Sequence, residues 1–554
     1  MSASAGGSAQ VVRSAGVVSA AVSVSRVTGL VRHMVMARLF GAGAIYDAFL
    51  LGFRIPNLTR DLFAEGALSA AFVPVFTQYL STKGRREAAE LSNLVATALL
   101  VVVGVFCVLG MVFSRQLVWL LAPGFAAVPG KFALAVSLTR VMFPFLLLVA
   151  LAAQAMAILN ACHRFGVPAL ASTWFNLGSV GFGLLIGYTA APRLGMDLVT
   201  AMACGVVLGG VLQVAWQAPS LRREGFSFQP RVNLAHPGLR RIFSMLGPAV
   251  IANAAVQVNI LVNTNFASAI TDAAGRVING PVSWLSYAFR FLQLPLGLFG
   301  SALAAATLPA ISRSVALGRM DEYRQTLAQS LGMVLLLTIP SAVGLAILGE
   351  SMIGVVFQWG RFREFDTHQT AHALAAYAVG LAGYAATKIL TPAFYALDDA
   401  RTPMLVSVVS MAVNLGAAIG LVKGAGLGHV GLALATSAVA LFSAAILFLL
   451  LRARLGYLHG RKIAASAARI LAASAAMGVV CLGSSRMLHA WVRSLQAARF
   501  ADVAVSIPLG LITFVLLCRG LRVAEVDLAR QALLGARAER GGAPRSGVER
   551  DTLH

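Results

Sequence analysis

The sequence predicts an all-α polytopic membrane protein with about fourteen transmembrane helices. Three observations support this prediction. Hydrophobic residues make up 58% of the 554-residue chain, charged residues make up only 12%, and the mean hydropathy is +0.80. Charged residues usually supply about a quarter of a soluble globular chain. A soluble protein of this length would therefore need a far more polar surface.

Apolar runs long enough to cross a bilayer recur along the whole chain, since one crossing needs about 20 largely apolar residues. The runs at 47–80 and 281–311 each contain two prolines, so we expect these spans to be tilted or broken. The predicted spans are 13–38, 47–80, 91–113, 132–160, 167–190, 197–219, 240–268, 281–311, 324–349, 366–395, 403–422, 429–451, 464–485 and 500–518.

The formal net charge of +23 is distributed unevenly over the loops. One alternating set of loops carries about two dozen Lys and Arg residues, and the other set about eleven. Because Lys and Arg gather in cytoplasmic loops, we expect both termini in the cytoplasm. A second interpretation is that part of the positive charge lines a path for an anion. No soluble basic domain is evident, so we expect no nucleic-acid partner.

The two halves of the chain resemble one another at a nearly constant spacing of about 235–239 residues. "GVPALASTWFNLG" resembles "RTPMLVSVVSMAVNLG", and "FRIP" resembles "FLQLP". The matched residues are Pro56 with Pro295, Pro168 with Pro403, and Asn176 with Asn414. We therefore expect two pseudo-symmetric six-helix lobes, related by an axis along the membrane normal. The predicted division is 1–225 for the first lobe, 226–455 for the second, 456–520 for two unduplicated spans and 521–554 for a basic cytoplasmic tail.

Charged residues inside the apolar runs are the candidates for a functional site. An intramembrane charge costs about 2.5–3.5 kcal/mol, so such residues face a cavity or a partner. The stretch "DAFLLGFRIPNLTRDLFAEGALS" places Asp47, Arg54, Asp61 and Glu65 on one face of an unbroken helix. Pro56 within it favours a bend. Carboxylate–guanidinium pairs would hold the arginines of this stretch in place.

Four arginines are predicted to converge from three spans and from both halves. They are Arg26, Arg32, Arg60 and Arg290. A guanidinium in a cavity of low dielectric suits a phosphate, because it can bind the phosphate bidentately. Such a cavity would repel cationic drugs and sodium ions and attract a pyrophosphate. The alternative is that each arginine snorkels to an interface or closes a structural ion pair. Further candidates are Arg54, Lys388 and Gln293, with Asn57 as a supporting polar residue.

No metal or cofactor is expected. His368 and His372 are spaced as i and i+4 in "DTHQTAH", but no third ligand accompanies them in a recognisable pattern. We expect Asp366 to cap a helix there. The five cysteines are scattered without a CxxC pattern, which is typical of buried thiols acting as small hydrophobes.

Several motifs occur in a fixed order: "SRVTGLVR", "FGAGAIYDAF", "PNLTRDLFAEGALSAAFVP", "APGF", "CHRFGVPA" and "FYALDDARTP". With them, the chain resembles the MurJ (MviN) lipid II flippase family of the multidrug/oligosaccharidyl-lipid/polysaccharide (MOP) exporter superfamily, along essentially its full length. The resemblance implies fourteen helices, two six-helix lobes around a central cavity, and a groove for the lipid tail at 456–520. It also implies a transporter without covalent chemistry, which flips lipid II to the periplasmic leaflet of the bacterial inner membrane by alternating access.

The resemblance also implies roles for particular residues. The family's required arginines fall on Arg26, Arg32, Arg60 and Arg290, and its important acids on Asp47 and Glu65. This chain departs from the family at His33 and Phe289, where relatives often carry Asp, and at Gln293, where they often carry Glu. These departures make the predicted cavity more positive. Some members bind sodium through an Asp in the seventh span, but 240–268 contains no acid here.

The expected partners are lipid II and membrane lipids, with cell-wall synthesis proteins as further candidates, and we expect a monomer. The nearest rival function is export of another polyprenyl-linked glycan, or of drugs, on the same fold. Rivals from other classes are a membrane enzyme acting on polyprenyl phosphates and a scaffold for cell-wall proteins.

Overall fold

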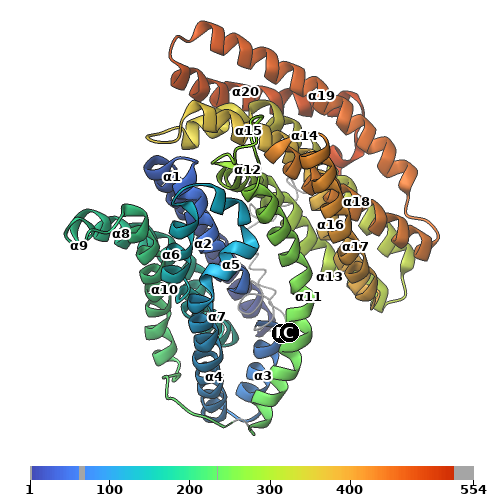
Figure 1. Ribbon diagram of the computed structural model, residues 1–554. Helices are drawn as coiled ribbons and strands as arrows, with labels where there is room; N and C mark the ends of the chain where they lie inside the picture. The colour runs from blue at the N-terminus through green and yellow to red at the C-terminus, as the bar shows by residue number, and fades with distance from the viewer. Residues whose placement is uncertain (1–2, 61–68, 234, 529–554) are drawn as a thin grey trace, which may run out of the picture. The chain divides into compact units, whose positions relative to one another are not determined.

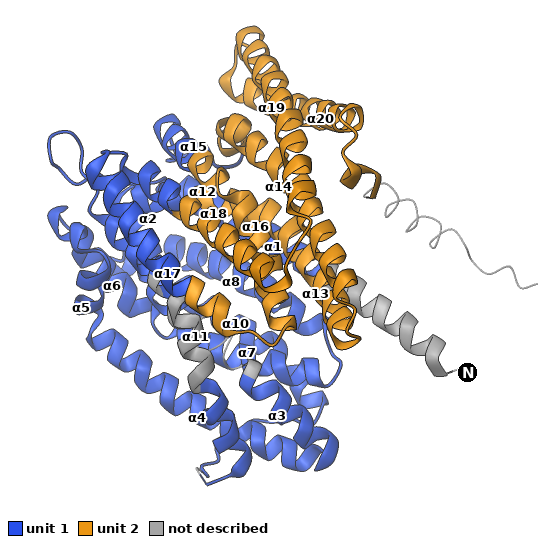
Figure 2. Ribbon diagram, turned by 90° about the vertical axis from the view of Figure 1, so that its right-hand side faces the viewer, with its two compact units in different colours: residues 1–287, 356–373, 407–435 blue, residues 288–355, 374–406, 436–554 orange. Residues whose placement is uncertain are grey.

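The computed structural model describes residues 3–60, 69–233 and 235–528. The chain forms two compact units, which are coloured separately in Figure 2. Unit 1 holds residues 1–287, 356–373 and 407–435, and unit 2 holds residues 288–355, 374–406 and 436–554. The described residues are overwhelmingly helical, and their β-structure is limited to one isolated bridge between Thr271 and Val277. The all-α prediction is confirmed, whereas the lobe boundary at residue 225 stays a prediction.

The helices, which are labelled in Figure 1, fall into three groups according to the unit that holds their residues. Those within unit 1 are α1 (Ala3–Phe40), α2 (Ala44–Arg60), α3 (Ser69–Thr82), α4 (Arg85–Val112), α5 (Ser114–Leu121), η2 (Pro123–Ala127), α6 (Lys131–Met142), α7 (Phe145–Ala161), α8 (Gly166–Thr189), α9 (Ala191–Leu194), α10 (Leu198–Arg223), α11 (Pro237–Ser268) and η4 (Ile419–Gly424). Those within unit 2 are η3 (Leu296–Gly300), α13 (Ser301–Ala316), α16 (Leu381–Ala396), α19 (Gly460–Trp491) and α20 (Leu495–Gly520). Five contribute residues to both units: α12 (Pro281–Pro295), α14 (Met320–Phe357), α15 (Glu364–Ala378), α17 (Arg401–Ala418) and α18 (Gly428–Leu455).

Ten described spans are long and apolar enough to cross a membrane, or eleven if α15 and α16, which are bent by 44°, form one. These helices coincide with all the predicted spans that follow residue 90, except the span at 240–268. The other predicted spans, 13–38, 47–80 and 240–268, lie on α1, on α2 and α3, and on α11, and residues 61–68 lie outside the described residues. The count of fourteen therefore stays a prediction.

A glycine contact joins α8 to α10 in unit 1. A Cβ atom built on Gly209 would lie 2.7 Å from the backbone nitrogen of Ser179 and 2.8 Å from the carbonyl oxygen of Phe175. Small residues of this kind let transmembrane helices approach closely and gain van der Waals contact. The α8–α10 packing therefore depends on the absence of a side chain at Gly209.

Replacing Gly209 by alanine is expected to lower the free energy of unfolding by about 1–3 kcal/mol, because the methyl group must separate two backbones. Thermal unfolding in detergent measures this change. Gly104→Ala in α4 is the matched control, since nothing lies within 4 Å of its Cβ position. The control should be neutral or stabilising by up to about 1 kcal/mol, because alanine favours helix more than glycine does. Equal unfolding temperatures for the two variants would contradict the close-packing argument.

Two loops that the sequence match pairs have the same backbone conformation. His163 follows α7 with φ 59°, and Asp398 follows α16 with φ 57°. The same backbone hydrogen bond closes both turns. His163 N donates to Asn160 O at 3.0 Å, and Asp398 N donates to Tyr395 O at 3.0 Å. The left-handed residue ends each helix in the same way. Two equivalent helix ends thus share a conformation that is uncommon for residues other than glycine.

An ion pair lies beside each of these loops. The loop supplies the cation in the first half and the anion in the second half. Arg164 Nε donates to Glu224 Oε1 at 2.8 Å, whereas Arg454 Nη1 donates to Asp399 Oδ2 at 2.6 Å. The hydrogen bond from Arg164 holds the pKa of Glu224 below its usual range. Hydrogen bonds from Thr402 lower the pKa of Asp399. Each loop is therefore fastened to the end of the last helix of its predicted lobe by a charge pair.

Each of the paired asparagines donates a hydrogen bond to the first helix of its own half. Asn176 Nδ2 on α8 donates to Ser25 O at 3.2 Å on α1, the first helix of the first half. Asn414 Nδ2 on α17 donates to Asn263 Oδ1 at 3.2 Å on α11, the first helix of the second half. Ser25 and Asn263 are separated by the same offset as the two asparagines. These two contacts agree with the duplication read from the sequence, which stays a prediction.

The two unduplicated spans form an antiparallel pair, α19 and α20, which lie side by side (Figure 1). An apolar cluster in unit 2 joins this pair to α14 through buried residues of all three helices. Its buried members are Leu336, Leu348, Ile470, Ala473, Met477, Cys481, Phe514, Cys518 and Val523. The expected break in 281–311 is not found: α12, the π-turn η3 and α13 follow one another as one helical span from Pro281 to Ala316, with the π-turn directly after Pro295.

Candidate functional site

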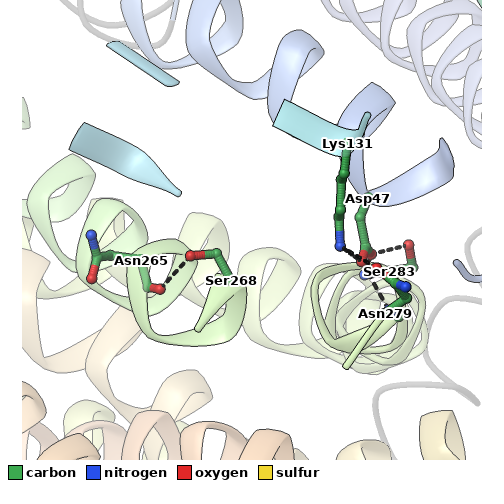
Figure 3. Close-up of polar contacts among 7 residues, drawn as sticks. Asp47, Lys131, Asn265, Ser268, Asn279 and Ser283 are labelled. Atoms are coloured by element: carbon green, nitrogen blue, oxygen red, sulfur yellow. Dashed lines mark hydrogen bonds and ion pairs between the residues drawn. The ribbon is translucent and has the colours of Figure 1, made fainter. Parts of the chain in front are cut away.

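A buried carboxylate lies at the centre of a cluster of polar contacts in unit 1. Asp47, in the first turn of α2, is fully buried, and Figure 3 shows its partners. Asp47 Oδ2 accepts hydrogen bonds from Lys131 Nζ at 2.8 Å and from Gly280 N at 2.8 Å. Asp47 Oδ1 accepts from Ser283 N at 2.9 Å and from Ser283 Oγ at 2.6 Å. We call Asp47, Lys131, Asn279, Gly280 and Ser283 the Asp47 cluster.

Local structure explains why these groups meet. Gly130, with φ 73°, turns the chain into α6, which begins at Lys131. Gly280 directly precedes α12, so its N–H and that of Ser283 are among the donors that a helix N-terminus leaves without internal partners. A carboxylate satisfies these donors and interacts favourably with the positive end of the helix dipole. Lys131 Nζ also donates to Asn279 Oδ1 at 2.9 Å.

This arrangement corrects the predicted partner of Asp47. We expected an arginine of the same stretch, but the cation is Lys131 on α6. The reason is geometric: Asp47 points to the start of α6 and α12. Arg54, further along α2, instead donates to Thr264 Oγ1 on α11 at 2.5 Å. Sequence reasoning missed Lys131, because a single lysine before an apolar run carries no signal of its distant partner.

The remaining candidates on α2 are described only in part. Asn57 is partly buried in the last turn of α2. Arg60 is the last residue of α2, but its side chain lies outside the described part of the chain, as do Asp61 and Glu65 entirely. Their predicted roles in the cavity stay predictions.

The two arginines of α1 differ in their surroundings. Arg26 is exposed, and Arg32 is partly buried. The Cζ atom of Arg32 lies 5.6 Å from the ring centroid of Phe53 on α2 and 5.2 Å from that of Phe175 on α8. Arg32 Nη2 also lies 3.5 Å from Nε2 of the buried His33. Sequence reasoning missed both rings, because phenylalanines in apolar spans look like lipid-facing or core residues.

The candidates of the second half belong to unit 2. Arg290 and Gln293 lie on exposed positions of α12. Lys388 is exposed on α16, and its Nζ donates to Ser301 Oγ at 2.7 Å. The ring of Phe289 packs against that of Tyr377, with centroids 5.4 Å apart. The convergence of all four arginines stays a prediction.

His368 and His372 are not part of a metal-binding cluster. Among the described residues, no group of three His, Cys, Asp or Glu side chains is placed to hold a metal ion. Asp366 has the capping role that we expected. Its Oδ2 accepts from Arg363 N at 3.0 Å, and its Oδ1 accepts from Trp284 Nε1 at 3.1 Å.

Comparisons with known proteins agree with this architecture. A family model described as lipid II flippase MurJ matches residues 36–501. A probable lipid II flippase MurJ of Vibrio cholerae serotype O1 is 32% identical over 533 residues, which cover 95% of this chain and 99% of the relative. The lipid II flippase MurJ of Burkholderia cenocepacia is 35% identical over 441 residues, which cover 79% of this chain and 83% of the relative.

Two solved structures have a similar fold. A lipid II flippase MurJ in an inward closed conformation has a TM-score of 0.73 at 23% identity, covering 91% of this chain and 99% of that one. A MATE family multidrug resistance transporter of the MOP superfamily, in an inward-facing conformation, has a TM-score of 0.65 at 14% identity, covering 79% of this chain and 94% of that one. At these identities, the likeness shows the fold alone.

Proposed function

The chain belongs to the lipid II flippase MurJ family, and from this premise we propose that it moves lipid II from the cytoplasmic to the periplasmic leaflet of the bacterial inner membrane. The observation that carries the proposal is the family match over residues 36–501. Lipid II joins a polyprenyl tail, a pyrophosphate and a disaccharide-pentapeptide. The protein must therefore bind an anion and shield polar groups from the bilayer, without making or breaking covalent bonds.

We propose that the four arginines bind the pyrophosphate of lipid II. Arg26 is exposed and Arg32 keeps part of its surface exposed, which leaves both accessible to a ligand. In the proposed mechanism, Arg60 and Arg290 complete the site. A guanidinium donates two parallel hydrogen bonds to neighbouring phosphate oxygens, and such charge-assisted bonds are stronger than neutral ones.

We assign the Asp47 cluster to the closure of the periplasmic side during alternating access. Asp47 and Lys131 come from the first predicted lobe. Asn279 and Gly280 end a loop of the second lobe that we expect to be periplasmic, and Ser283 lies in the first turn of α12. Withdrawal of α12 from α2 would break the bonds from Gly280 and Ser283. The Asp47–Lys131 pair, at 2.8 Å, would stay intact. The closed state is thus released without leaving an unpaired buried charge.

The unduplicated helices suit the polyprenyl tail. Val479 on α19 and Leu511 and Leu516 on α20 are among the exposed large hydrophobic residues. Such surfaces favour contact with hydrocarbon chains. We further propose that the protein acts as a monomer with both termini in the cytoplasm, and that the membrane potential acts on the charged cavity and its cargo.

Complementation of a bacterium depleted of its own lipid II flippase tests both cargo and site. We expect the wild type and the control Arg193→Ala, at an exposed position of α9, to restore growth and cell shape. Arg32→Ala and Arg60→Ala should fail at equal expression, with lipid II accumulating in the cytoplasmic leaflet. Each loses a charge-assisted contact of about 1.5–3 kcal/mol, or more than tenfold in binding.

The outcomes separate the alternatives. Failure of the wild type would reject lipid II as the cargo, and a change in drug sensitivity alone would favour an exporter of drugs. Rescue by both arginine variants would reject the pyrophosphate site and favour a scaffold.

A further inference from the structure

We propose that residues 228–232, in the connection between α10 and α11, contact the lipids of the leaflet that we expect to be cytoplasmic. We further propose that neighbouring arginines bind the phosphate of anionic bilayer lipids there. This contact is separate from the pyrophosphate site and does not depend on the cargo. The connection runs past α4 (Figure 1). We call residues 228–232 the lipid-contact segment.

The backbone donors in the middle of this segment are accounted for by side chains of α4. Gln229 N donates to Asn93 Oδ1 at 3.1 Å, and Arg231 N donates to Thr97 Oγ1 at 3.1 Å. Pro230, between them, has no N–H. Contact with lipid favours such an arrangement, because hydrocarbon offers a backbone donor no hydrogen-bond partner. A segment surrounded by water could bond its N–H groups to solvent instead.

The positions of Asn93 and Thr97 on α4 set the depth of the lipid-contact segment. Both residues lie in the first two turns of the predicted span 91–113. One turn beyond Thr97, α4 begins to expose large apolar side chains, and an exposed apolar surface of this kind marks a membrane contact. These side chains are Val101, Val102, Val105, Phe106, Val108, Leu109 and Val112. The segment therefore lies at the end of this apolar face, where headgroups meet hydrocarbon.

The side chains of the segment suit this boundary. Phe228 is 53% exposed and Val232 is 77% exposed, so an apolar group stands at each end. Nη1 of Arg231 lies 3.8 Å from Oε1 of Glu90, which offsets its charge. Phe226, just before the segment, is buried in an apolar cluster with residues of α3 and α4. The chain is thus fixed to the protein on one side while Phe228 stays available to lipid.

Arginines beside the segment supply the charge that attracts anionic headgroups. Residues 222–241 contain five arginines and one glutamate, Glu224. Arg222 and Arg223, at the end of α10, are exposed. Glu224 already accepts a hydrogen bond from Arg164, so its charge is taken up there. A basic surface beside exposed apolar groups is the pattern that binds anionic membrane surfaces.

Fluorescence quenching by brominated lipids tests the contact in the full-length protein. Phe228→Trp introduces a fluorophore into the segment, and its emission is obtained by subtracting that of the wild type. The bilayers contain phosphatidylcholine and phosphatidylglycerol in equal parts, with one of the two brominated. We expect both lipids to quench the emission. Phosphatidylglycerol should bind about 5- to 25-fold more strongly than phosphatidylcholine, because each arginine near an anionic surface contributes roughly fivefold.

Two further variants locate the effect. Phe106→Trp, on the exposed face of α4, is the matched control, and both lipids should quench its emission equally. Adding Arg222→Gln and Arg223→Gln to Phe228→Trp should reduce the preference for phosphatidylglycerol by about fivefold or more. Quenching by phosphatidylcholine should not change. All the replaced side chains are exposed, so the variants should unfold at temperatures near that of the wild type.

The inference fails in three cases. An unquenched fluorophore in Phe228→Trp, with that of Phe106→Trp quenched, would place the segment in water and favour a soluble protein partner. Absence of quenching in both variants would show that the assigned membrane face of α4 is wrong. Equal binding of the two lipids, or a preference that persists without Arg222 and Arg223, would reject the phosphate contact. None of these outcomes bears on lipid II transport, which complementation tests separately.

Discussion

Lys131→Met is expected to lower the free energy of unfolding by about 3–5 kcal/mol, the usual cost of breaking a buried ion pair from one side. Asp47 and Lys131 are both buried, and their charged atoms are 2.8 Å apart. Methionine fills a similar volume, so the loss comes from the charge. The Asp47 carboxylate would keep its bonds from Gly280 and Ser283 but would have lost its cation. Thermal or denaturant unfolding of the purified protein in detergent measures the effect.

Two further variants separate charge from packing. Asp47→Asn combined with Lys131→Met should recover a large part of the lost stability, because it removes the uncompensated carboxylate. Lys423→Met, at an exposed position in η4, should change stability by less than about 0.5 kcal/mol. If Lys131→Met behaved like Lys423→Met, the ion pair would contribute nothing to the fold.

Arg499→Leu is expected to lower the free energy of unfolding of unit 2 by about 2–4 kcal/mol, because it removes a fully buried side chain and its ion pair. Arg499 Nη2 on α20 lies 3.2 Å from Glu350 Oε1 on α14. Its aliphatic part fills the space above Gly354, where a Cβ atom would lie 2.6 Å from Arg499 Cδ. Leucine fills only part of that volume and leaves a cavity. The unfolding temperature and protease cleavage between α19 and α20 report the loss.

The matched control is Arg486→Leu, at an exposed position of α19. It should leave both measurements close to those of the wild type. Asp502 provides a second link, because its carboxylate accepts hydrogen bonds from Ser351 at 2.5 Å and Ser485 at 2.8 Å. We therefore expect α20 to loosen from α14 without separating completely. Identical behaviour of the two arginine variants would show that Arg499 does not help to hold α20 against α14.

The sequence predicted the helices well, because apolar length is a local property. The predicted span 167–190 is α8 at Gly166–Thr189, and 197–219 is α10 at Leu198–Arg223. A local irregularity near Pro295 was also foreseeable, because proline cannot donate a backbone hydrogen bond, but the helix continues through a π-turn and does not break. The short elements α5 and η2, between the third and fourth predicted spans, were not predicted. They are too short for an apolar-run criterion.

Partners were harder to predict than elements. The sequence marked Asp47 as important but not Lys131, since their pairing spans several helices. Arg32 could be recognised as a candidate from its charge, but the sequence did not show that the ring of Phe175 lies beside it. A charge inside an apolar run is conspicuous because it is costly, but its compensating group can be any donor that the fold brings near. Tertiary contacts of this kind are not encoded by spacing along one segment.

The contact between α2 and the N-terminus of α12 has a consequence for how voltage can act. Asp47 and Lys131 together carry no net charge, and Asn279, Gly280 and Ser283 are neutral. The work done by an electric field depends on the charge displaced, about 2.3 kcal/mol per charge for 100 mV. Making or breaking this contact should therefore be electrically silent. Any gating current during turnover would then originate in other residues or in the substrate itself.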